Sequence, residues 1–354
     1  MSDNLETASN LRSVDWGDDA LVIIDQTLLP GEVSYLRLTT VDQVVRAIKS
    51  LAVRGAPSIG VAGGFGVILA FREFSTEKAQ FVSAVESLRR VRPTAVNLAR
   101  SVDRVARRAE EGMEAMLAEA TAIRDEEIAA CWSMGINGAE LLVELLGNRP
   151  QRLMTICNTG GLAAVERGTA LGVIQTMFER GLLEEALAVE TRPLLQGSRL
   201  TTWELARMGA PFRLLVDSAG PFVLARGGAE AVLTGADRIA ANGDTANKVG
   251  SLALALGARH AGAPFIVVAP ESTIDEDTPT GDMIEIEDRG AAEVIAAAGI
   301  QLAPETTQAL NPAFDVTPVE LITAIVTDRR IVRVDRGEKL ADVPLGERRL
   351  RAEQ

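Results

Sequence analysis

The sequence is poor in cysteine, and this shortage narrows the classes of protein it can encode. Among 354 residues there are two cysteines, Cys131 and Cys157, and they form no CxxC pair. Two cysteines cannot build the disulfide framework of a small secreted domain, so a cytoplasmic location is expected. The acidic and polar start, MSDNLETASN, also lacks the features of a signal peptide.

Positive charge and long hydrophobic runs are scarce as well. The chain has 36 Lys and Arg against 49 Asp and Glu, a net charge of −13. Without an excess of basic residues to neutralise phosphates, neither nucleic acid nor an anionic membrane is an expected partner. The longest apolar run, residues 59–71, is shorter than the ~20 residues that a spanning helix needs.

The remaining composition is that of a globular protein with an ample core. Hydrophobic residues make up 47% of the chain and charged residues 24%. The length suggests about two domains. The rhythm of the sequence changes at Gly147-Asn148-Arg149-Pro150, so we expect one domain over residues 1–147 and a second over 148–354.

The N-terminal part has the pattern of a helical domain with a small β-element. Residues 20–38 predict a hairpin around a Pro-Gly turn, and Thr40 predicts the cap of a following helix. The helix should end before the segment 54–58, and a tightly packed glycine-rich helix should follow it. Residues 76–146 carry apolar side chains three and four apart, with a break expected at Arg92-Pro93-Thr94.

In the C-terminal part, short apolar runs alternate with helix-length segments, which favours a doubly wound, largely parallel sheet. The sequence Thr317-Pro318-Val319-Glu320 has the form of a capping box and predicts a helix through Ile325. A short strand over 330–334 is expected to close the sheet edge. The predicted strands are LMTIC (153–157), EALAVE (185–190), FRLLVDS (212–218), EAVLTGAD (230–237) and PFIVVAP (264–270).

The stretch 232–250 carries the densest set of polar residues after a predicted strand. Asp237 lies at the strand tip, where desolvation would raise its pKa toward a general-acid role. A helix predicted to begin near Asn247 and Lys248 would offer free N–H groups and a cation to a phosphate. A solvated turn with a capping aspartate fits the same residues.

Three more predicted strands end in polar or reactive residues. Cys157 precedes Gly160-Gly161 and a helix expected from about Ala163, whose N-terminus would lower the thiol pKa. A buried, inert cysteine is the alternative. Gln196 follows the second strand and Asp217-Ser218 the third. Because the carboxyl ends of parallel strands share one edge, these residues together predict a ligand site.

Seven longer motifs are distributed along the chain: RGAP (54–57), RPTAVNL (92–98), CNTGGLA (157–163), GTALGVI (168–174), ETRPLLQG (190–197), GADRIAANGD (235–244) and NPAFDVTP (311–318). They resemble those of the methylthioribose-1-phosphate isomerase family. The similarity covers about residues 14 to 335. It implies a mostly helical N-terminal domain on a Rossmann-like C-terminal domain, conversion of an aldose 1-phosphate to a ketose 1-phosphate in methionine salvage, no metal or other cofactor, and a homodimer.

The resemblance also implies roles for individual residues. Asp237 matches the general acid of the family and Cys157 its second catalytic group. The sequence departs from the family pattern at Ile156 and Val189, where histidine and aspartate are common. The residues that match the substrate-binding positions are Arg54, Gly55, Ala56, Arg92, Gln196, Asn247 and Lys248.

The same resemblance leaves other functions open. A related pentose 1-phosphate, such as 5-deoxyribose 1-phosphate or ribose 1,5-bisphosphate, is an alternative substrate. A non-catalytic regulatory subunit, like the related α, β and δ subunits of translation initiation factor 2B, is an alternative of another class. A purely regulatory subunit does not need both Cys157 and Asp237, so their joint presence favours an enzyme.

Overall fold

The computed structural model describes residues 6–7, 10–92, 96–297 and 299–349. The chain divides into two compact units. The first comprises residues 1–132, 159–168 and 350–354, and the second comprises 133–158 and 169–349. Helix α5 (Met113–Leu146) contributes residues to both units and ends just before the predicted boundary. The domain bounds 1–147 and 148–354 therefore stay a prediction.

The β-structure of the first unit confirms the predicted hairpin and adds a third strand to it. Strands β4 and β5 pair antiparallel with Ile24 opposite Tyr35, and β3 pairs with the other side of β4. The strands of this unit are β1 (Glu6–Thr7), β2 (Asn10–Leu11), β3 (Val14–Gly17), β4 (Ala20–Ile24) and β5 (Tyr35–Leu38), with β1 paired to β2.

The first helix of this unit begins where the local sequence predicts, whereas the glycine-rich helix begins earlier, within the segment 54–58. Thr40 and Gln43 form a capping box at the start of α1. Pro57 does not separate two elements but lies in the first turn of α2, where its missing N–H has no intrahelical acceptor. Pro93 and Thr94, at the predicted break, lie outside the described residues. The helices are α1 (Val41–Lys49), α2 (Ala56–Phe74), α3 (Lys78–Arg90), α4 (Val96–Ala106) and the first part of α5.

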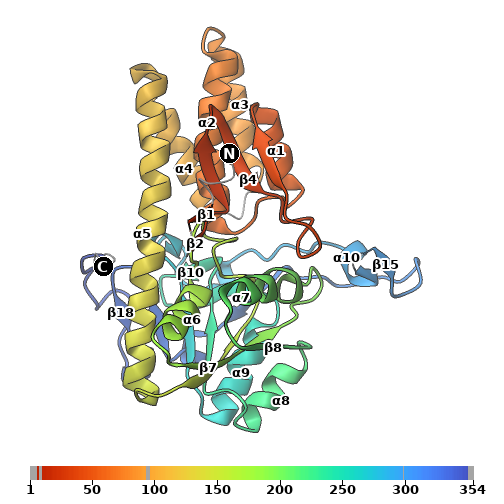
Figure 1. The fold of residues 1–354 in the computed structure, drawn as a ribbon, viewed down its shortest axis with the longest axis vertical. Coiled ribbons are helices and arrows are strands. Elements are labelled where there is room, and N and C mark those ends of the chain that lie inside the picture. Colours follow the sequence, from red (N-terminus) through yellow and green to blue (C-terminus); the bar gives the residue numbers. More distant parts are fainter. Residues whose placement is uncertain (1–5, 8–9, 93–95, 298, 350–354) are drawn as a thin grey trace. The chain divides into compact units, whose positions relative to one another are not determined.

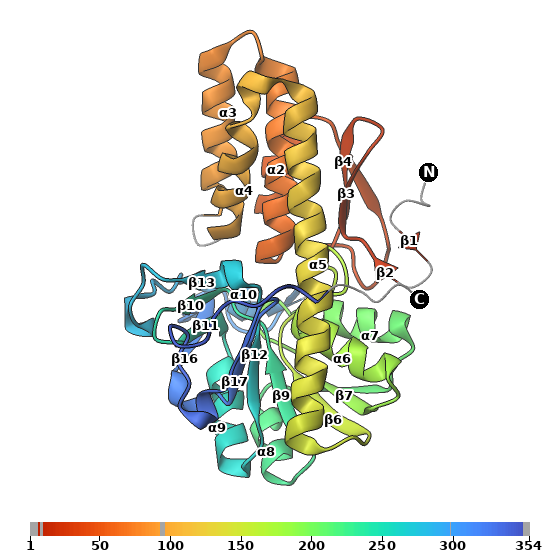
Figure 2. The ribbon, with the colours of Figure 1, turned by 90° about the vertical axis from the view of Figure 1, so that its left-hand side faces the viewer.

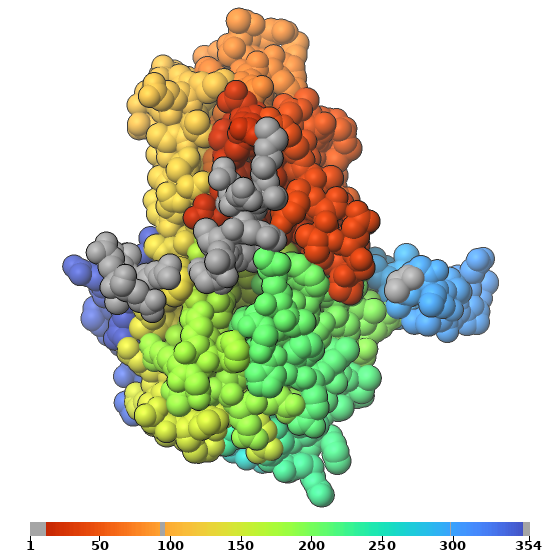
Figure 3. All heavy atoms as spheres, in the orientation of Figure 1, coloured from red at the N-terminus to blue at the C-terminus, as the bar shows by residue number. Residues whose placement is uncertain are grey.

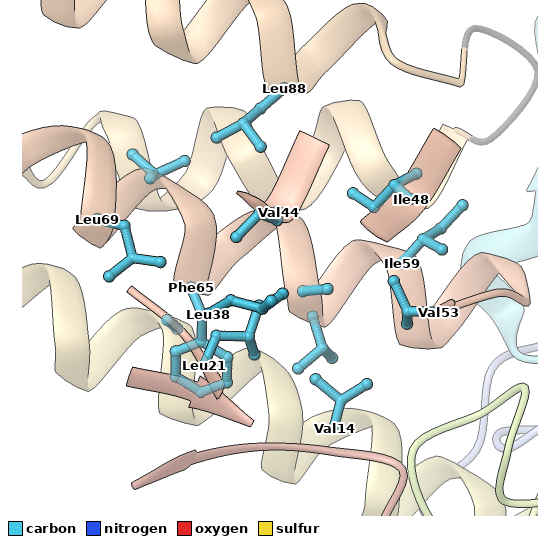
Figure 4. Close-up of a cluster of buried hydrophobic side chains, with 14 of the residues drawn as sticks. Val14, Leu21, Leu38, Val44, Ile48, Val53, Ile59, Phe65, Leu69 and Leu88 are labelled. Carbon is cyan, nitrogen blue, oxygen red and sulfur yellow. The ribbon is translucent and has the colours of Figure 1, made fainter. Parts of the chain in front are cut away.

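The core of the first unit surrounds α2, as the glycine-rich sequence predicts. A Cβ at Gly63 would lie 2.4 Å from the Leu98 side chain, so glycine lets α2 and α4 approach closely. Figure 4 shows Val44 of α1, Phe65 of α2 and Leu88 of α3 in one buried cluster. No helix among the described residues is both long and apolar enough to cross a membrane.

The second unit contains the predicted parallel sheet, in the strand order β18-β17-β12-β9-β6-β7-β8. Figure 2 shows β17, β12, β9, β6 and β7 side by side. Every neighbouring pair is parallel except β17 and β18, so the predicted last strand does close one edge. The strands are β6 (Gln151–Thr155), β7 (Leu183–Val189), β8 (Phe212–Leu215), β9 (Ala231–Thr234), β12 (Phe265–Val268), β17 (Ala324–Val326) and β18 (Ile331–Val332).

Helices pack against this sheet and bury its strands. Leu224 of α8 and Leu254 of α9 share a buried cluster with Met154 of β6 and Val232 of β9. Because successive strand residues face opposite sides, the buried neighbours of Met154 and Val232 face the other side of the sheet. The helices of this unit are α6 (Ala170–Glu179), α7 (Thr202–Met208), α8 (Ala219–Ala225) and α9 (Ser251–Ala261), with the last part of α5.

The predicted helix after Thr317 is wrong. One 3-10 turn, Val319–Leu321, is followed by strand β17, which begins at Ala324. The N–H of Val319 bonds to Asp244 Oδ1 at 2.8 Å, while the Thr317 hydroxyl has no hydrogen-bond partner among the described residues and so caps nothing. Ile325 is fully buried between β12 and β18, because a β-branched segment gains more from the sheet than a short helix would.

A second, smaller sheet in this unit has the order β13-β10-β11-β16. Between β13 and β16 the chain leaves the sheets as an extension that includes α10 (Ala292–Ile295) and the paired strands β14 (Ala296–Ala297) and β15 (Ile300–Gln301). Figures 1 and 3 show this extension standing away from the sheets of the second unit. The strands of the small sheet are β10 (Arg238–Ala240), β11 (Thr245–Lys248), β13 (Ile274–Asp275) and β16 (Phe314–Thr317).

Candidate functional site

The carboxyl ends of β6, β7 and β8 are tied together by hydrogen bonds from residue to residue. The Asp217 carboxylate, after β8, accepts from the N–H of Thr191 at 2.8 Å and of Arg192 at 2.7 Å, both after β7. The Thr191 hydroxyl accepts from the N–H of Cys157, after β6, at 2.9 Å. The polar strand ends seen in the sequence therefore meet at one edge of the sheet.

Cys157 has a left-handed backbone conformation, with a φ of 64°. The helix predicted from about Ala163 is absent: residues 161–163 form a turn, and α6 begins at Ala170. The carbonyl groups of this segment are instead hydrogen-bonded within the first unit. For example, the N–H of Ser58 donates to the carbonyl of Ala163 at 3.2 Å. The expected activation of the thiol by a helix terminus at Ala163 is therefore wrong.

Gln196 lies at the start of a single π-helical turn, Gly197–Thr201, that leads into α7. Its side chain is fully buried. A Cβ on Gly197 would lie 1.7 Å from the carbonyl oxygen of Val189, so only glycine lets this turn approach the end of β7. Such π-turns occur frequently at functional sites.

Asp237 lies between the two sheets of the second unit, after β9 and directly before β10. Its N–H donates to the carbonyl of Ala246 on β11 at 2.9 Å. The next residue, Arg238, is opposite Ala246 in the β10–β11 ladder and pairs with Asp275 at 3.2 Å. The ladder thus brings Asp237 beside Asn247, and the side chain of Asp237 is partly exposed.

The helix predicted to begin near Asn247 and Lys248 is wrong in its start. Both residues lie in β11, where Asn247 pairs with Asp315 of β16, and α9 begins at Ser251. The Asp315 carboxylate accepts from the N–H of Gly250 at 2.7 Å and of Leu252 at 3.1 Å. The sequence predicted that N–H groups at this helix start would bind a phosphate, but the N–H groups of Gly250 and Leu252 donate to Asp315 instead.

The side chains of Asn247 and Lys248 are both buried and hydrogen-bonded. Asn247 Nδ2 donates to Thr234 Oγ1 at 2.6 Å and to Ser251 Oγ at 2.8 Å. Lys248 Nζ donates to the carbonyl of Ala313 at 2.6 Å and lies 4.4 Å from the centroid of the Phe314 ring. The protein therefore holds both side chains in fixed positions.

The electrostatics around Lys248 centre on Asp315. Burial raises the pKa of the Asp315 carboxyl to about 6. The two N–H donors from Gly250 and Leu252 and the charge of Lys248 act in the opposite direction, because they favour the carboxylate. Asp315 is thus a partly desolvated carboxyl beside two predicted substrate-binding residues.

The second unit gathers five of the predicted site residues at the carboxyl edge of its main sheet. Strands β6 and β9 are neighbours, with Thr155 opposite Leu233, so the segments carrying Cys157 and Asp237 leave the sheet side by side. Asn247 is hydrogen-bonded to the last residue of β9. The five are Cys157, Gln196, Asp237, Asn247 and Lys248.

The other four predicted residues belong to the first unit. Arg54, Gly55 and Ala56 lie at the start of α2, and Arg92 follows α3. Gly55 has a φ of 87°, and a Cβ there would lie 2.2 Å from the carbonyl oxygen of Ala163. Glycine is thus required at this position, while roles for all nine residues in binding or catalysis stay predictions.

The sequence did not predict the structural roles of three residues near this edge: Thr191, Thr201 and Asp315. Each lies within or near a motif that was singled out, but their partners are distant along the chain. Thr201 Oγ1, for example, donates to the carbonyl of Cys157 at 2.5 Å across 44 positions. Among the described residues, no group of three His, Cys, Asp or Glu side chains is arranged to hold a metal ion.

Comparison with known proteins identifies the family. The Initiation factor 2 subunit family matches residues 52–333. The methylthioribose-1-phosphate isomerase of Anaeromyxobacter sp. (strain Fw109-5) is 50% identical over 321 residues, which are 90% of this chain and 93% of the relative. A probable bifunctional methylthioribose-1-phosphate isomerase/methylthioribulose-1-phosphate dehydratase of Nocardia farcinica is also 50% identical, and the chain spans 59% of its length.

Two further similarities bear on substrate and fold. The 5-deoxyribose 1-phosphate isomerase of Moorella thermoacetica is 44% identical, covering 95% of this chain and 98% of the relative. The crystal structure of 5-methylthioribose 1-phosphate isomerase from Pyrococcus horikoshii OT3 matches with a TM-score of 0.84 and 40% identity, over 91% of this chain and 92% of that one. The helical first unit and the largely parallel sheet of the second agree with that structure. The chain therefore belongs to the initiation factor 2 subunit family and, within it, to the methylthioribose-1-phosphate isomerases.

Proposed function

We propose that the protein isomerises 5-methylthioribose 1-phosphate to 5-methylthioribulose 1-phosphate, a step of methionine salvage. The observation that carries the proposal is that Cys157 and Asp237 follow adjacent parallel strands, β6 and β9, in a chain 50% identical to a methylthioribose-1-phosphate isomerase. A thiol and a carboxyl at one sheet edge supply the two proton-transfer groups that this isomerisation needs.

Asp237 is the proposed general acid. The phosphate on the anomeric oxygen prevents simple opening of the sugar ring to an aldehyde. A proton from Asp237 to the ring oxygen lets the bond between C1 and that oxygen break, with the electron pair leaving on the oxygen and an electron-poor C1 remaining. Asp237 directly precedes β10 and is partly exposed, which supports its access to a bound sugar.

Hydrogen then passes from C2 to C1, by one of two balanced routes. In the first, Cys157 takes the C2 proton, an enol forms between C1 and C2, and C1 is protonated as the C2 hydroxyl becomes a ketone. In the second, a hydride moves directly from C2 to C1 and the C2 hydroxyl loses its proton. Substrate deuterated at C2 distinguishes the routes, because a direct shift keeps the deuterium at C1 and an enol exchanges it with water.

The residues proposed to contact the substrate offer positive charge and hydrogen-bond donors or acceptors. Arg54 and Arg92 supply positive charge for the phosphate, and the N–H groups of Gly55 and Ala56 supply further donors. Gln196, Asn247 and Lys248 bind the sugar hydroxyls and the phosphate in this proposal. The buried, hydrogen-bonded positions of Asn247 and Lys248 support it, because side chains that are already held in place lose little entropy when a ligand binds.

A panel of pentose 1-phosphates with different 5-substituents tests the proposal. We expect the purified protein to convert 5-methylthioribose 1-phosphate with the highest kcat/KM, and ribose 1,5-bisphosphate with the lowest. A protein that folds and converts none of the panel would contradict the proposal and favour a regulatory subunit.

5-Deoxyribose 1-phosphate is the second candidate substrate. The 44% identity to the 5-deoxyribose 1-phosphate isomerase of Moorella thermoacetica, nearly as high as that to the methylthioribose relatives, favours it. The two sugars differ only at C5, so the same active-site chemistry serves both. A higher kcat/KM for 5-deoxyribose 1-phosphate in the panel would make it the preferred substrate.

The setting we propose for this activity is a cytoplasmic homodimer that binds neither nucleic acid nor membranes. The net charge of −13 supports the second part, because phosphate polymers and anionic lipids would be repelled. Light scattering after size exclusion is expected to give about twice the 37.6 kDa of one chain. A mass of one chain at micromolar concentration would contradict the dimer and leave the isomerase proposal standing.

A further inference from the structure

The backbone of Cys157 is held between two buried threonine hydroxyls. Its N–H donates to Thr191 Oγ1 at 2.9 Å, and its carbonyl accepts from Thr201 Oγ1 at 2.5 Å. Both threonines have no exposed side-chain surface. Cys157 has a φ of 64°, a backbone conformation that residues other than glycine rarely adopt. These two hydrogen bonds therefore oppose relaxation of the backbone to an ordinary conformation.

Thr191 is itself held by two further hydrogen bonds. Its hydroxyl donates to the carbonyl of Val189 at 3.0 Å, which leaves the oxygen lone pairs to accept the Cys157 N–H. Its own N–H is bonded to Asp217 Oδ1 at 2.8 Å. Thr191 also has a left-handed φ of 64°, so the carboxylate of Asp217 stabilises a strained turn directly behind the cysteine.

Thr201 is placed by the π-helical turn. The turn spans Gly197–Thr201, and Thr201, its last residue, is fully buried. Thr201 Oγ1 also lies 3.4 Å from Asn158 Nδ2, which donates to Glu204 Oε1 at 2.7 Å. The residues on both sides of the Cys157–Asn158 peptide are therefore bonded to one short helical segment.

We propose that Thr191 and Thr201, with Asp217 behind Thr191, are positioning residues that fix the direction of the Cys157 thiol during isomerisation. The inference rests on the proposed role of Cys157 in the reaction. Each hydroxyl bonds the cysteine backbone, so the threonines act through Cys157 and not on the substrate. A thiol must point at one hydrogen of a bound sugar, and a displacement of ~1 Å costs up to about 10²-fold in rate.

Isosteric substitutions test the inference. Thr191→Val and Thr201→Val keep the side-chain volume and remove the hydroxyl, whereas Thr191→Ser and Thr201→Ser keep it. Thr155→Val is the matched control, because Thr155 is a buried residue of β6 whose hydroxyl has no hydrogen-bond partner among the described residues.

Two readouts separate positioning from simple packing. We expect kcat to fall by about 10- to 100-fold in each valine variant while KM changes less than about threefold, since an orienting group affects the reacting geometry. The rate at which iodoacetamide alkylates Cys157, followed by peptide mass spectrometry, should change severalfold in the valine variants. The serine variants should restore both values, and Thr155→Val should match wild type.

The outcomes distinguish this inference from the function on which it rests. If Cys157→Ala is inactive and both valine variants keep kcat within twofold of wild type, the positioning role is wrong and the isomerase proposal stands. If Cys157→Ala turns over near the wild-type rate, the thiol role itself fails. Should either valine variant not fold, Asp217→Asn decides on the same criterion: a fall in kcat supports the inference, and unchanged kcat and alkylation overturn it.

Discussion

Asp237 is the residue whose replacement should separate binding from catalysis. Asparagine is nearly isosteric with aspartate and can still accept a hydrogen bond, so Asp237→Asn should fold and bind sugar phosphate normally. The amide cannot deliver a proton to the ring oxygen, so kcat should fall about 10²- to 10⁴-fold. Steady-state kinetics with 5-methylthioribose 1-phosphate, paired with calorimetric binding, measures both quantities.

Asp277→Asn is a suitable control for this substitution, since Asp277 is exposed in the same unit and has no proposed role. It should stay within twofold of wild type. If Asp237→Asn binds normally and turns over within a few-fold of wild type, Asp237 has no part in proton transfer.

Lys248 is expected to act on binding more than on turnover. Losing a charged phosphate contact removes an interaction made in both ground and transition states, so Lys248→Ala should raise KM by about 10- to 100-fold with a smaller change in kcat. Lys248→Met keeps the apolar stem beside Phe314 and removes only the ammonium group, so it should show the same rise in KM with less loss of thermal stability.

The exposed Lys339 provides the control for charge alone, and Lys339→Ala should leave KM unchanged. An unchanged KM in both Lys248 variants would exclude a role in phosphate binding. The role of Lys248 would then be structural, through its hydrogen bond to the carbonyl of Ala313.

At the level of elements, the start of α2 depends on glycine for two reasons that can be measured apart. Gly55→Ala meets both a φ of 87° and a contact of 2.2 Å with the carbonyl of Ala163, whereas Gly112→Ala meets a φ of 92° and open space. We expect Gly112→Ala to cost about 1 kcal/mol and Gly55→Ala about 2–4 kcal/mol. Differential scanning calorimetry should show the larger fall in Tm for Gly55→Ala. Equal falls in Tm would mean that the backbone at Ala163 moves away from the added Cβ without a loss of stability.

The cap of α9 by Asp315 should make stability depend on pH. The pKa of Asp315 is raised from 3.8 to about 6 in the folded protein. Because the folded state binds this proton more tightly than the unfolded state, the contribution is full below about pH 4 and is lost as pH rises through about 6. Between ~pH 4 and ~pH 7 this contribution should fall by about 3 kcal/mol at most.

Asp315→Asn removes this titration and keeps an oxygen to accept one of the two N–H groups. The free energy of unfolding of wild type minus that of the variant should therefore decrease as pH rises from ~4 to ~7. Urea unfolding of both proteins across this range measures the difference. A difference that is constant, or that grows with pH, would contradict a raised pKa at Asp315.

For the molecule as a whole, the charge balance sets a testable solubility profile. With a net charge of −13 at pH 7 and an isoelectric point near 4.8, self-repulsion is strong at neutral pH and vanishes near pH 4.8. We expect a solubility minimum close to that pH at low salt, measured by light scattering of serial precipitations. Equal solubility at pH 4.8 and pH 7.5 would contradict the argument.

The sequence by itself determined the features that depend on neighbouring residues. The capping box at Thr40, the hairpin over residues 20–38 and the close packing of α2 follow from local chemistry and periodicity. The parallel strands β6 to β12 were likewise predictable, because short apolar runs between helical segments have few other arrangements. Four of the polar strand ends could be placed at one edge for the same reason.

Only the tertiary structure decided the elements whose hydrogen-bond partners are distant along the chain. Asn247 and Lys248 lie in a strand because β16, more than sixty positions later, supplies the other half of the ladder and Asp315 caps α9 in place of a ligand. The segment 159–168 stays irregular because its carbonyls are bonded within the first unit, and Ile325 enters the sheet because β12 offers an open edge. Local propensity differs by less than about 1 kcal/mol between these alternatives, so long-range pairing and burial determine the outcome.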